Sequence, residues 1–218
     1  MKINRIQIVL IIILTLLSSC IRMKVASEPM TSNNANHWWT LWLDAPACMP
    51  PCWENITPGK TTYAEALAIL ESLPGIVFLY SDDRIGLEWI FDKNKTDTGE
   101  IKLNPDGTVY RIWLGNSSDQ KLYLKSVIAS FGPPTFVQPY DCREGMCSTA
   151  LAYPDQGMML EVFVKNLADD NGHQVKIESN VEIYSVRFFI PEFIEYNNML
   201  MDEKYIFTTK WKGYGTYP

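Results

Sequence analysis

Hydrophobic positions in the first half of the chain follow two different periods. From residue 63, apolar side chains recur every three or four positions, which is the spacing of one helix face: Tyr63, Ala66, Leu67, Leu70 and Leu73. Thr62 and Glu65 have the spacing of a capping box, in which each side chain satisfies a free backbone N–H at a helix start. Pro74 and Gly75 end the pattern. We therefore predict a helix that begins after Thr62 and ends before Pro74.

Short apolar stretches between turn residues follow this helix and predict β strands. Residues 108–114 alternate most clearly, and the alternation puts two sets of side chains on opposite faces of a sheet: Val109, Arg111 and Trp113 against Tyr110, Ile112 and Leu114. The sequence Asn-Pro-Asp-Gly at 104–107 predicts a tight turn before this strand. The predicted strands are 76–80, 87–91, 99–103, 108–114, 136–140, 149–153, 158–164 and 182–190.

A second helix-then-strand pattern begins about 60 residues further along. Ser118 or Asp119 can cap a helix with its own apolar stripe: Leu124, Val127, Ile128 and Phe131. We interpret the two patterns as copies of one unit, at about 56–115 and 118–190, and the alternative is a chance likeness between ordinary helices and strands. The predicted fold class is α+β, with two tandem helix-plus-antiparallel-meander repeats and the helices packed on one face of the sheet.

Two short motifs carry a family resemblance. Gly59-Lys60-Thr61 leads into the first helix, and Leu73-Pro74-Gly75 ends it. Together they resemble the opening of small bacterial lipoproteins of the SmpA/OmlA (BamE-like) type and of the related tandem-repeat beta-lactamase-inhibitor proteins. Residues 131–134, Phe-Gly-Pro-Pro, are similar to the end of the same motif, although this copy lacks the Gly-x-Thr start. The resemblance implies a fold of helices on an antiparallel sheet and a role in binding other proteins.

The amino terminus has the parts of a secretory signal. Lys2 and Arg5 precede an apolar run of about a dozen residues, which is shorter than the roughly 20 that a spanning helix needs. The run ends in Leu17-Ser18-Ser19-Cys20, which resembles the bacterial lipobox. The resemblance implies that residues 1–19 are a lipoprotein signal peptide and that Cys20 is lipidated and begins the mature chain. We therefore expect a lipid-anchored membrane protein on the extracytoplasmic face.

Composition defines the rest of the domain plan. We assign residues 20–43 to the lipidated start and a flexible tether, because 26–36 are small and polar. Residues 44–201 are assigned to the two-repeat domain and 202–218 to an aromatic tail. With 47% hydrophobic residues the chain can bury a proper core. Removal of the signal peptide takes away two basic residues and no acids, which changes the formal net charge from −6 to −8 and argues against nucleic acid as a partner.

Four cysteines remain after Cys20. Cys48 and Cys52 flank Met-Pro-Pro, and Cys142 and Cys147 lie further along the chain. An even number in an exported chain predicts two disulfides, and the close spacings favour Cys48–Cys52 and Cys142–Cys147. The cross pairings, which would tie the two repeats together, stay open at this point.

Chemical alternatives have weaker signals. Cys48-x-x-x-Cys52 with a distant histidine resembles the copper site of exported copper chaperones, so a metal-handling lipoprotein is one alternative. The only histidines, His37 and His173, lie in the tether and in a turn, so we predict no bound metal or cofactor. No Ser-His-Asp or Cys-His set is visible, and we predict no catalytic residues. An envelope hydrolase with dispersed carboxylates is the second alternative, because its acids need not be neighbours in sequence.

Aromatic residues are the remaining signal for binding. Trp38 and Trp39 precede the first cysteine pair, and Trp211 and Tyr214 lie in the tail. Tryptophan and tyrosine are enriched at recognition surfaces because they bury much area at little entropic cost. We predict that these four residues bind, although the first pair can instead dock on the domain as a cap. The predicted function is a non-catalytic binding or assembly module of the cell envelope with an unknown protein or glycan partner.

Overall fold

A computed structural model describes residues 38–91, 97–117, 120–168, 174–191 and 209–218, all of them in one compact unit, residues 34–218. The predicted signal peptide, Cys20, the tether up to residue 37 and residues 202–208 of the tail lie outside these ranges. The described residues contain no helix of the length and apolar character needed to cross a membrane.

The described residues form three short α helices, α2 (Trp38–Asp44), α3 (Tyr63–Ser72) and α4 (Leu124–Phe131), and a 3-10 turn, η1 (Pro154–Gln156). The capping box of α3 is confirmed, because the Thr62 hydroxyl accepts from the Glu65 amide and the Glu65 carboxylate accepts from the Thr62 amide. The predicted cap of the second helix is wrong. That helix begins only at Leu124, and Tyr123 at its start makes no capping hydrogen bond through its side chain.

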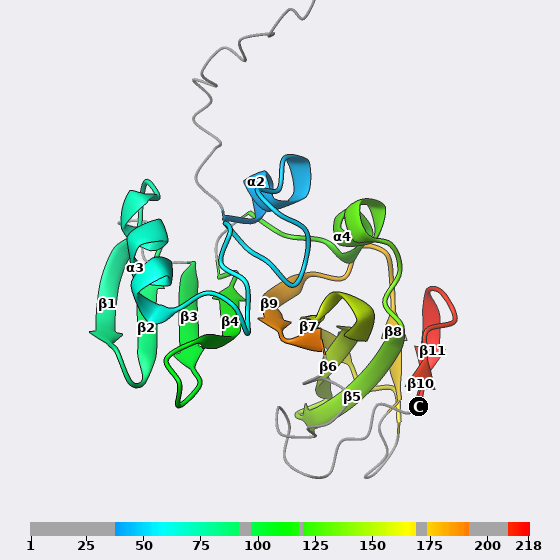
Figure 1. Ribbon diagram of the computed structural model, residues 1–218. Coiled ribbons are helices and arrows are strands. Elements are labelled where there is room, and N and C mark those ends of the chain that lie inside the picture. Colours follow the sequence, from blue (N-terminus) through cyan, green and yellow to red (C-terminus); the bar gives the residue numbers. More distant parts are fainter. Residues whose placement is uncertain (1–37, 92–96, 118–119, 169–173, 192–208) are drawn as a thin grey trace, which may run out of the picture. The chain divides into compact units, whose positions relative to one another are not determined.

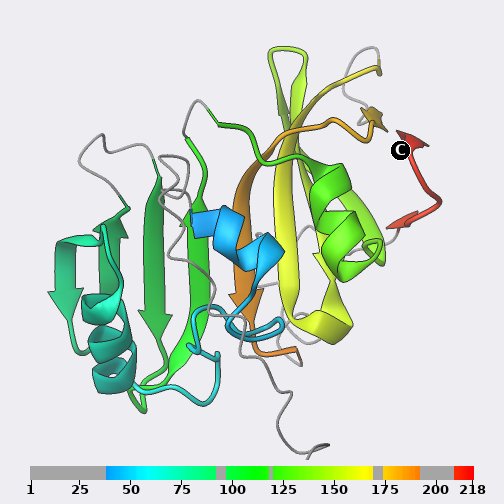
Figure 2. The same cartoon turned by 90° about the horizontal axis from the view of Figure 1, so that it is seen from above.

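Eleven strands form two antiparallel sheets in the described residues. Figure 2 shows the strands of the larger sheet side by side, with the helices in front of them. Their bounds are β1 (Val77–Asp82), β2 (Gly86–Ile90), β3 (Thr98–Leu103), β4 (Val109–Gly115), β5 (Phe136–Arg143), β6 (Met146–Tyr153), β7 (Met158–Lys165), β8 (Val175–Ile177), β9 (Ile183–Phe189), β10 (Thr209–Lys210) and β11 (Gly215–Tyr217). All eight predicted strands are therefore confirmed with small changes at their ends, and β8, β10 and β11 are additional.

The larger sheet has the strand order β1-β2-β3-β4-β9-β7-β6-β5-β10 (Figure 1). Strands β1 to β4 follow one another as a meander, and β9 joins this meander to β7, β6 and β5 through the β4–β9 pair. The smaller sheet pairs β8 with β11. Because β10 pairs with β5 and β11 with β8, residues 209–217 are part of the domain rather than of a separate tail.

The predicted α+β class, with helices as a packed layer, is wrong. The described part of the unit is mostly antiparallel β sheet, and the longest α helix in it, α3, has only 10 residues. At 1.5 Å rise per residue such a helix is about 15 Å long, so three of them cannot form a layer over nine strands. The helical spacing in the sequence correctly marked α3 and α4, but these two helices contain few residues.

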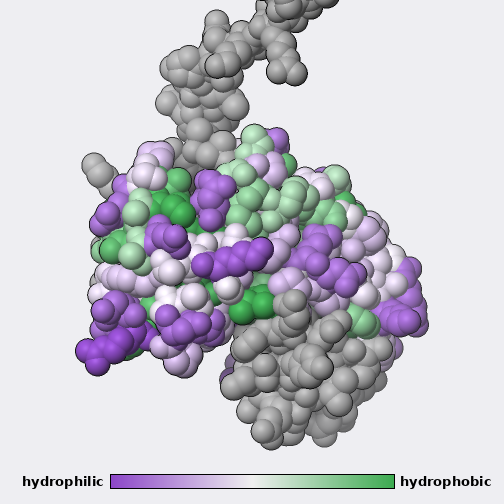
Figure 3. Space-filling view, in the orientation of Figure 1, coloured by the Kyte–Doolittle hydropathy of each residue, from purple (hydrophilic) through white to green (hydrophobic). Residues whose placement is uncertain are grey.

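The main hydrophobic core joins residues of the three helices to one face of the larger sheet. Trp42 of α2 stacks on Phe131 of α4 with ring centroids 4.7 Å apart and meets Phe188 of β9 edge to face at 5.8 Å. Residues 38–43 therefore belong to a helix whose Trp38 and Trp42 side chains are buried, and assigning them to the tether is wrong. Figure 3 shows hydrophilic and hydrophobic residues intermixed over this side of the molecule.

Candidate functional site

The register of the central strands brings polar residues into line on the other face of the sheet. Trp113 of β4 is paired across strands with Glu100 of β3 and with Arg187 of β9. Glu88 of β2 is the partner of Glu100 on the far side. Because directly opposed residues point to the same side of a sheet, these four side chains form a row. We call the surface formed by this row and by Glu161 of β7 the polar face.

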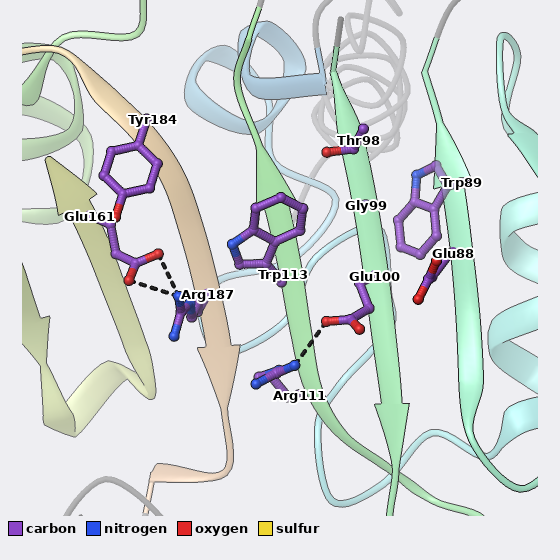
Figure 4. A pocket seen from close by; sticks show the side chains of 10 residues that line it. All are labelled: Glu88, Trp89, Thr98, Gly99, Glu100, Arg111, Trp113, Glu161, Tyr184 and Arg187. Carbon is purple, nitrogen blue, oxygen red and sulfur yellow. Dashed lines mark hydrogen bonds and ion pairs between the residues drawn. The ribbon is translucent and has the colours of Figure 1, made fainter. Parts of the chain in front are cut away.

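The polar face is hollowed around Trp113. A cavity of about 520 Å³ opens there, within the range of about 300–1,000 Å³ typical of small-molecule sites. Figure 4 shows the Trp113 side chain between two ion pairs, Glu161–Arg187 on one side and Glu100–Arg111 on the other. The lining residues come from β2, β3, β4, β7 and β9: Glu88, Trp89, Thr98, Gly99, Glu100, Arg111, Trp113, Glu161, Tyr184 and Arg187.

A glycine in the neighbouring row makes room for the tryptophan ring. Gly115 lies two residues after Trp113 on β4, opposite Thr98 of β3 and Ser185 of β9. A Cβ atom at position 115 would lie 2.6 Å from the Trp113 ring and 2.9 Å from the Thr98 hydroxyl, which is too close for any side chain. The ring therefore lies against the strand backbone, and its position depends on the missing side chain at 115.

Glu161 is a buried carboxylate whose oxygens are fully engaged. Its side chain is 1% exposed, and both oxygens accept from the Arg187 guanidinium at 2.7 Å. The Tyr140 hydroxyl donates to the same carboxylate at 2.7 Å, and the Ser185 hydroxyl donates to it as well. A buried ion pair keeps its geometry when its remaining lone pairs are satisfied in this way. The network therefore holds the Arg187 guanidinium in place at the edge of the hollow.

Two tyrosines extend the network along the face. The hydroxyl oxygens of Tyr140 and Tyr184 are 3.1 Å apart. Burial, together with the Glu161 charge, raises the pKa of both phenols above the usual value, so both stay neutral donors in ordinary conditions. The Tyr184 ring stacks on Phe163 at 4.2 Å, and Phe163 is 53% exposed. An aromatic surface therefore continues outward from the hollow.

The second ion pair balances the charge of the site. Glu100 accepts from Arg111 Nη2 at 2.8 Å and pairs with Lys102, whose Nζ also lies 3.9 Å from Glu88. The three carboxylates on this face thus meet three basic side chains. Among the described residues, Arg111 and Arg187 each use only Nη2 in hydrogen bonds, although a guanidinium carries five N–H donors.

The cysteines pair as their spacing favours. Cys48–Cys52 and Cys142–Cys147 are joined as disulfides, with Cα–Cα separations of 5.7 and 4.0 Å. The first lies beside Trp53, which is buried and stacks on Trp89. The cross pairings are excluded in this structure, and neither cysteine of the first pair is free to bind copper. The described residues contain no group of three His, Cys, Asp or Glu side chains that could hold a metal ion.

The four aromatic residues predicted to bind do not come together. Trp38 is 5% exposed, and its indole N–H donates to the carbonyl of Gly115 at 3.3 Å, so its assignment to a binding surface is wrong. Trp39 is half-buried against the core. In the tail, Trp211 stacks on Tyr217 at 5.8 Å, and Tyr214 meets it edge to face with 47% of its surface exposed. Of the four predicted residues, Tyr214 is the one that is well exposed.

None of the residues of the polar face was predicted as a site residue, although the alternation in 108–114 placed Arg111 and Trp113 on one side of a strand. Glu100, Glu161 and Arg187 lie on three other strands. Glu161 is the only charged residue in the apolar run Met158–Val164, which is the one signal that could have marked it as a buried, paired carboxylate. An alternation signal identifies the outward residues of one strand, whereas the site depends on which strands are neighbours.

Comparisons with known proteins add little. No family model matches the chain, and no curated protein matches it. Among solved structures, the chain is similar to a DUF4309 family protein, YjgB, from Bacillus subtilis, at 10% sequence identity over 70% of this chain and 93% of that chain, with a TM-score of 0.39. A likeness of this size supports no argument about function, which has to come from the site itself.

Proposed function

We propose that this protein is a lipid-anchored, non-catalytic binding module of the cell envelope that holds its ligand in the hollow of the polar face. The observation that carries the proposal is the position of Trp113 between two arginine–carboxylate pairs. Tryptophan, tyrosine and arginine contribute most of the binding energy at recognition sites, and all three line this one hollow.

The anchor is proposed from the amino terminus of the sequence. A basic start, a short apolar run and the lipobox-like Leu17 to Cys20 support export and lipidation of Cys20. Both cysteine pairs of the domain are disulfides, and such bonds persist in oxidising compartments outside the cytoplasm. Two or more acyl chains on Cys20 would hold the protein stably at the membrane, on its extracytoplasmic face.

Binding is favoured over hydrolysis by the state of the carboxylates. Glu161 is buried and accepts four hydrogen bonds, and Glu100 is held by Arg111 and Lys102. A general acid, base or nucleophile has to present an oxygen to the substrate, and these oxygens are already occupied. Glu88 is half exposed and has no second exposed carboxylate among the described lining residues to work with.

Lipidation can be tested on the full chain in a bacterial host. Cells expressing the protein are labelled with an alkyne analogue of palmitate and then separated into membrane and soluble fractions. We expect label on the wild type and a membrane-bound protein, and neither for Cys20→Ala. Label that survives Cys20→Ala would contradict the proposed anchor.

The polar face can be tested by photo-crosslinking in the same cells. Benzoylphenylalanine replaces either Phe163, which is 53% exposed beside the hollow, or Ile85, which is 51% exposed at the β1–β2 turn. We expect adducts with envelope material from position 163 and not from 85, and we expect Trp113→Ala to remove them. Equal adducts from both positions, or none from 163, would show that this face is not the binding surface.

A further inference from the structure

Among the described residues, the charges at the hollow are balanced, and this limits what the hollow can attract. Its lining carries Glu88, Glu100 and Glu161 with Arg111 and Arg187. Lys102, just outside the lining, pairs with Glu88 and Glu100, so each carboxylate has a basic partner within 4 Å. An anionic or cationic ligand would be attracted by one half of these charges and repelled by the other. We infer that the ligand of the polar face is a neutral glycan, and the inference rests on the proposed binding function of this face.

Paired charges still offer strong hydrogen bonds to a neutral ligand. The Nε–H groups of Arg111 and Arg187 are buried, but each guanidinium also carries an Nη1 group beyond the Nη2 that its glutamate uses. Glu88 keeps a half-exposed carboxylate. The Thr98 hydroxyl lies at the edge of the hollow. Charged donors and acceptors form hydrogen bonds about twice as strong as neutral ones. Neighbouring sugar hydroxyls both donate and accept hydrogen bonds. They therefore suit a site in which donors and acceptors surround the Trp113 ring.

The aromatic residues suit the apolar side of a sugar. One face of a pyranose ring carries C–H groups, which pack against the negative face of an aromatic ring. Trp113 lies in the middle of the hollow, and Tyr184 lies at its wall. Because the Tyr184 ring stacks on the exposed Phe163, the aromatic surface extends past the hollow. This arrangement fits successive units of an oligosaccharide better than a single sugar.

The site is preorganised for such a ligand. Gly115 holds the Trp113 ring against the strand, and the buried Glu161 network holds Arg187. Groups that are already ordered lose little conformational entropy on binding, which matters for glycans because their own affinities are low. The whole chain is acidic, so a charge-neutral hollow is a local property and not a reflection of the composition.

The inference is tested with the folded, disulfide-bonded protein and defined sugars. Cellohexaose, maltohexaose, chitohexaose and mannohexaose are titrated by calorimetry up to millimolar concentration, with oligogalacturonate of equal length as the charged comparison. We expect at least one neutral hexasaccharide to bind, with an affinity that salt hardly changes because no net charge is involved. Oligogalacturonate should not bind more tightly than the neutral sugars.

Variants then locate the binding. Trp113→Ala should weaken it about tenfold or more, as expected for a central aromatic anchor. Trp113→Phe keeps a ring and should recover part of the affinity, which separates loss of stacking from loss of folding. Tyr123→Ala, at an aromatic residue that is 37% exposed and does not line the hollow, should leave affinity unchanged. Equal weakening by Trp113→Ala and Tyr123→Ala would overturn the inference.

Two further outcomes separate this inference from the proposed function. If no neutral hexasaccharide binds at millimolar concentration while position 163 still gives Trp113-dependent adducts with a protein, the glycan inference is wrong and the binding face stands. The glycan inference is also wrong, and the binding face stands, if only the charged oligogalacturonate binds and its affinity falls steeply with salt. If position 163 gives no adducts and no sugar binds, both proposals fail.

Discussion

Replacing Glu161 with glutamine tests whether the buried network holds the polar face together. The substitution keeps the size of the side chain and removes its charge. Glu161 is 1% exposed and accepts from Arg187, Tyr140 and Ser185. Glutamine leaves one oxygen as an acceptor and points an NH2 group at donors, so the Arg187 guanidinium loses its counter-charge while it stays mostly buried.

The size of the effect follows from the burial of both partners. Removing one partner of a buried ion pair costs about 3–5 kcal/mol. Arg187 is 19% exposed, so water compensates part of the loss, and we expect the lower end, about 3 kcal/mol. With an m-value of about 3 kcal/mol per molar urea, the unfolding midpoint should fall by about 1 M. Urea denaturation of the oxidised protein at neutral pH measures this shift.

The surface pair Lys121–Glu182 gives a matched control. Its atoms are also 2.7 Å apart, but the side chains are 43% and 39% exposed. Glu182→Gln should cost no more than about 1 kcal/mol. A double variant, Glu161→Gln with Arg187→Met, should be more stable than Glu161→Gln alone, because it removes the unpaired charge. If Glu161→Gln costs no more than Glu182→Gln, the reasoning about this network is refuted.

Three further predictions concern other parts of the fold. Replacing both Cys48 and Cys52 with serine should lower the free energy of unfolding by about 2 kcal/mol, measured by urea denaturation, because the closed loop is short. Burial and a nearby carboxylate raise the pKa of Tyr140, so above pH ~10 the unfolded chain loses this proton while the folded chain keeps it. Stability should therefore fall as pH rises past that value, and less steeply in Tyr140→Phe. Gly115→Ala should displace the Trp113 ring, cost about 1–3 kcal/mol and shift the tryptophan emission, whereas unchanged emission would argue against the contact.

Local patterns predicted local structure well where their cause is local. The helix after Thr62 was found because its first hydrogen bonds depend on residues three apart in sequence. All eight predicted strands were found because a short apolar stretch between turn residues marks a strand whatever its neighbours are. The second helix start was missed because its cap makes no side-chain hydrogen bond and so has no sequence signature.

Predictions that depended on distant contacts failed or stayed untested. Trp38 is equally compatible in sequence with a surface cluster and with a core residue, and the packing of α2 decided for the core. The predicted α+β class was wrong because two short helical patterns were taken to indicate a whole layer of helices. The lipid anchor at Cys20 is a prediction of the sequence and lies outside the described residues.

For the candidate site, the sequence by itself determined that Arg111 and Trp113 share one side of a strand, because successive side chains alternate. Tertiary structure decided everything else about it. Pairing β4 with both β3 and β9, in one register, sets Trp113 between Glu100 and Arg187. A shift of one residue would turn those side chains to the opposite face. That register is selected because it buries the hydrophobic face of the whole sheet. Strands from distant parts of the chain build this face, so no single stretch of the sequence encodes the register.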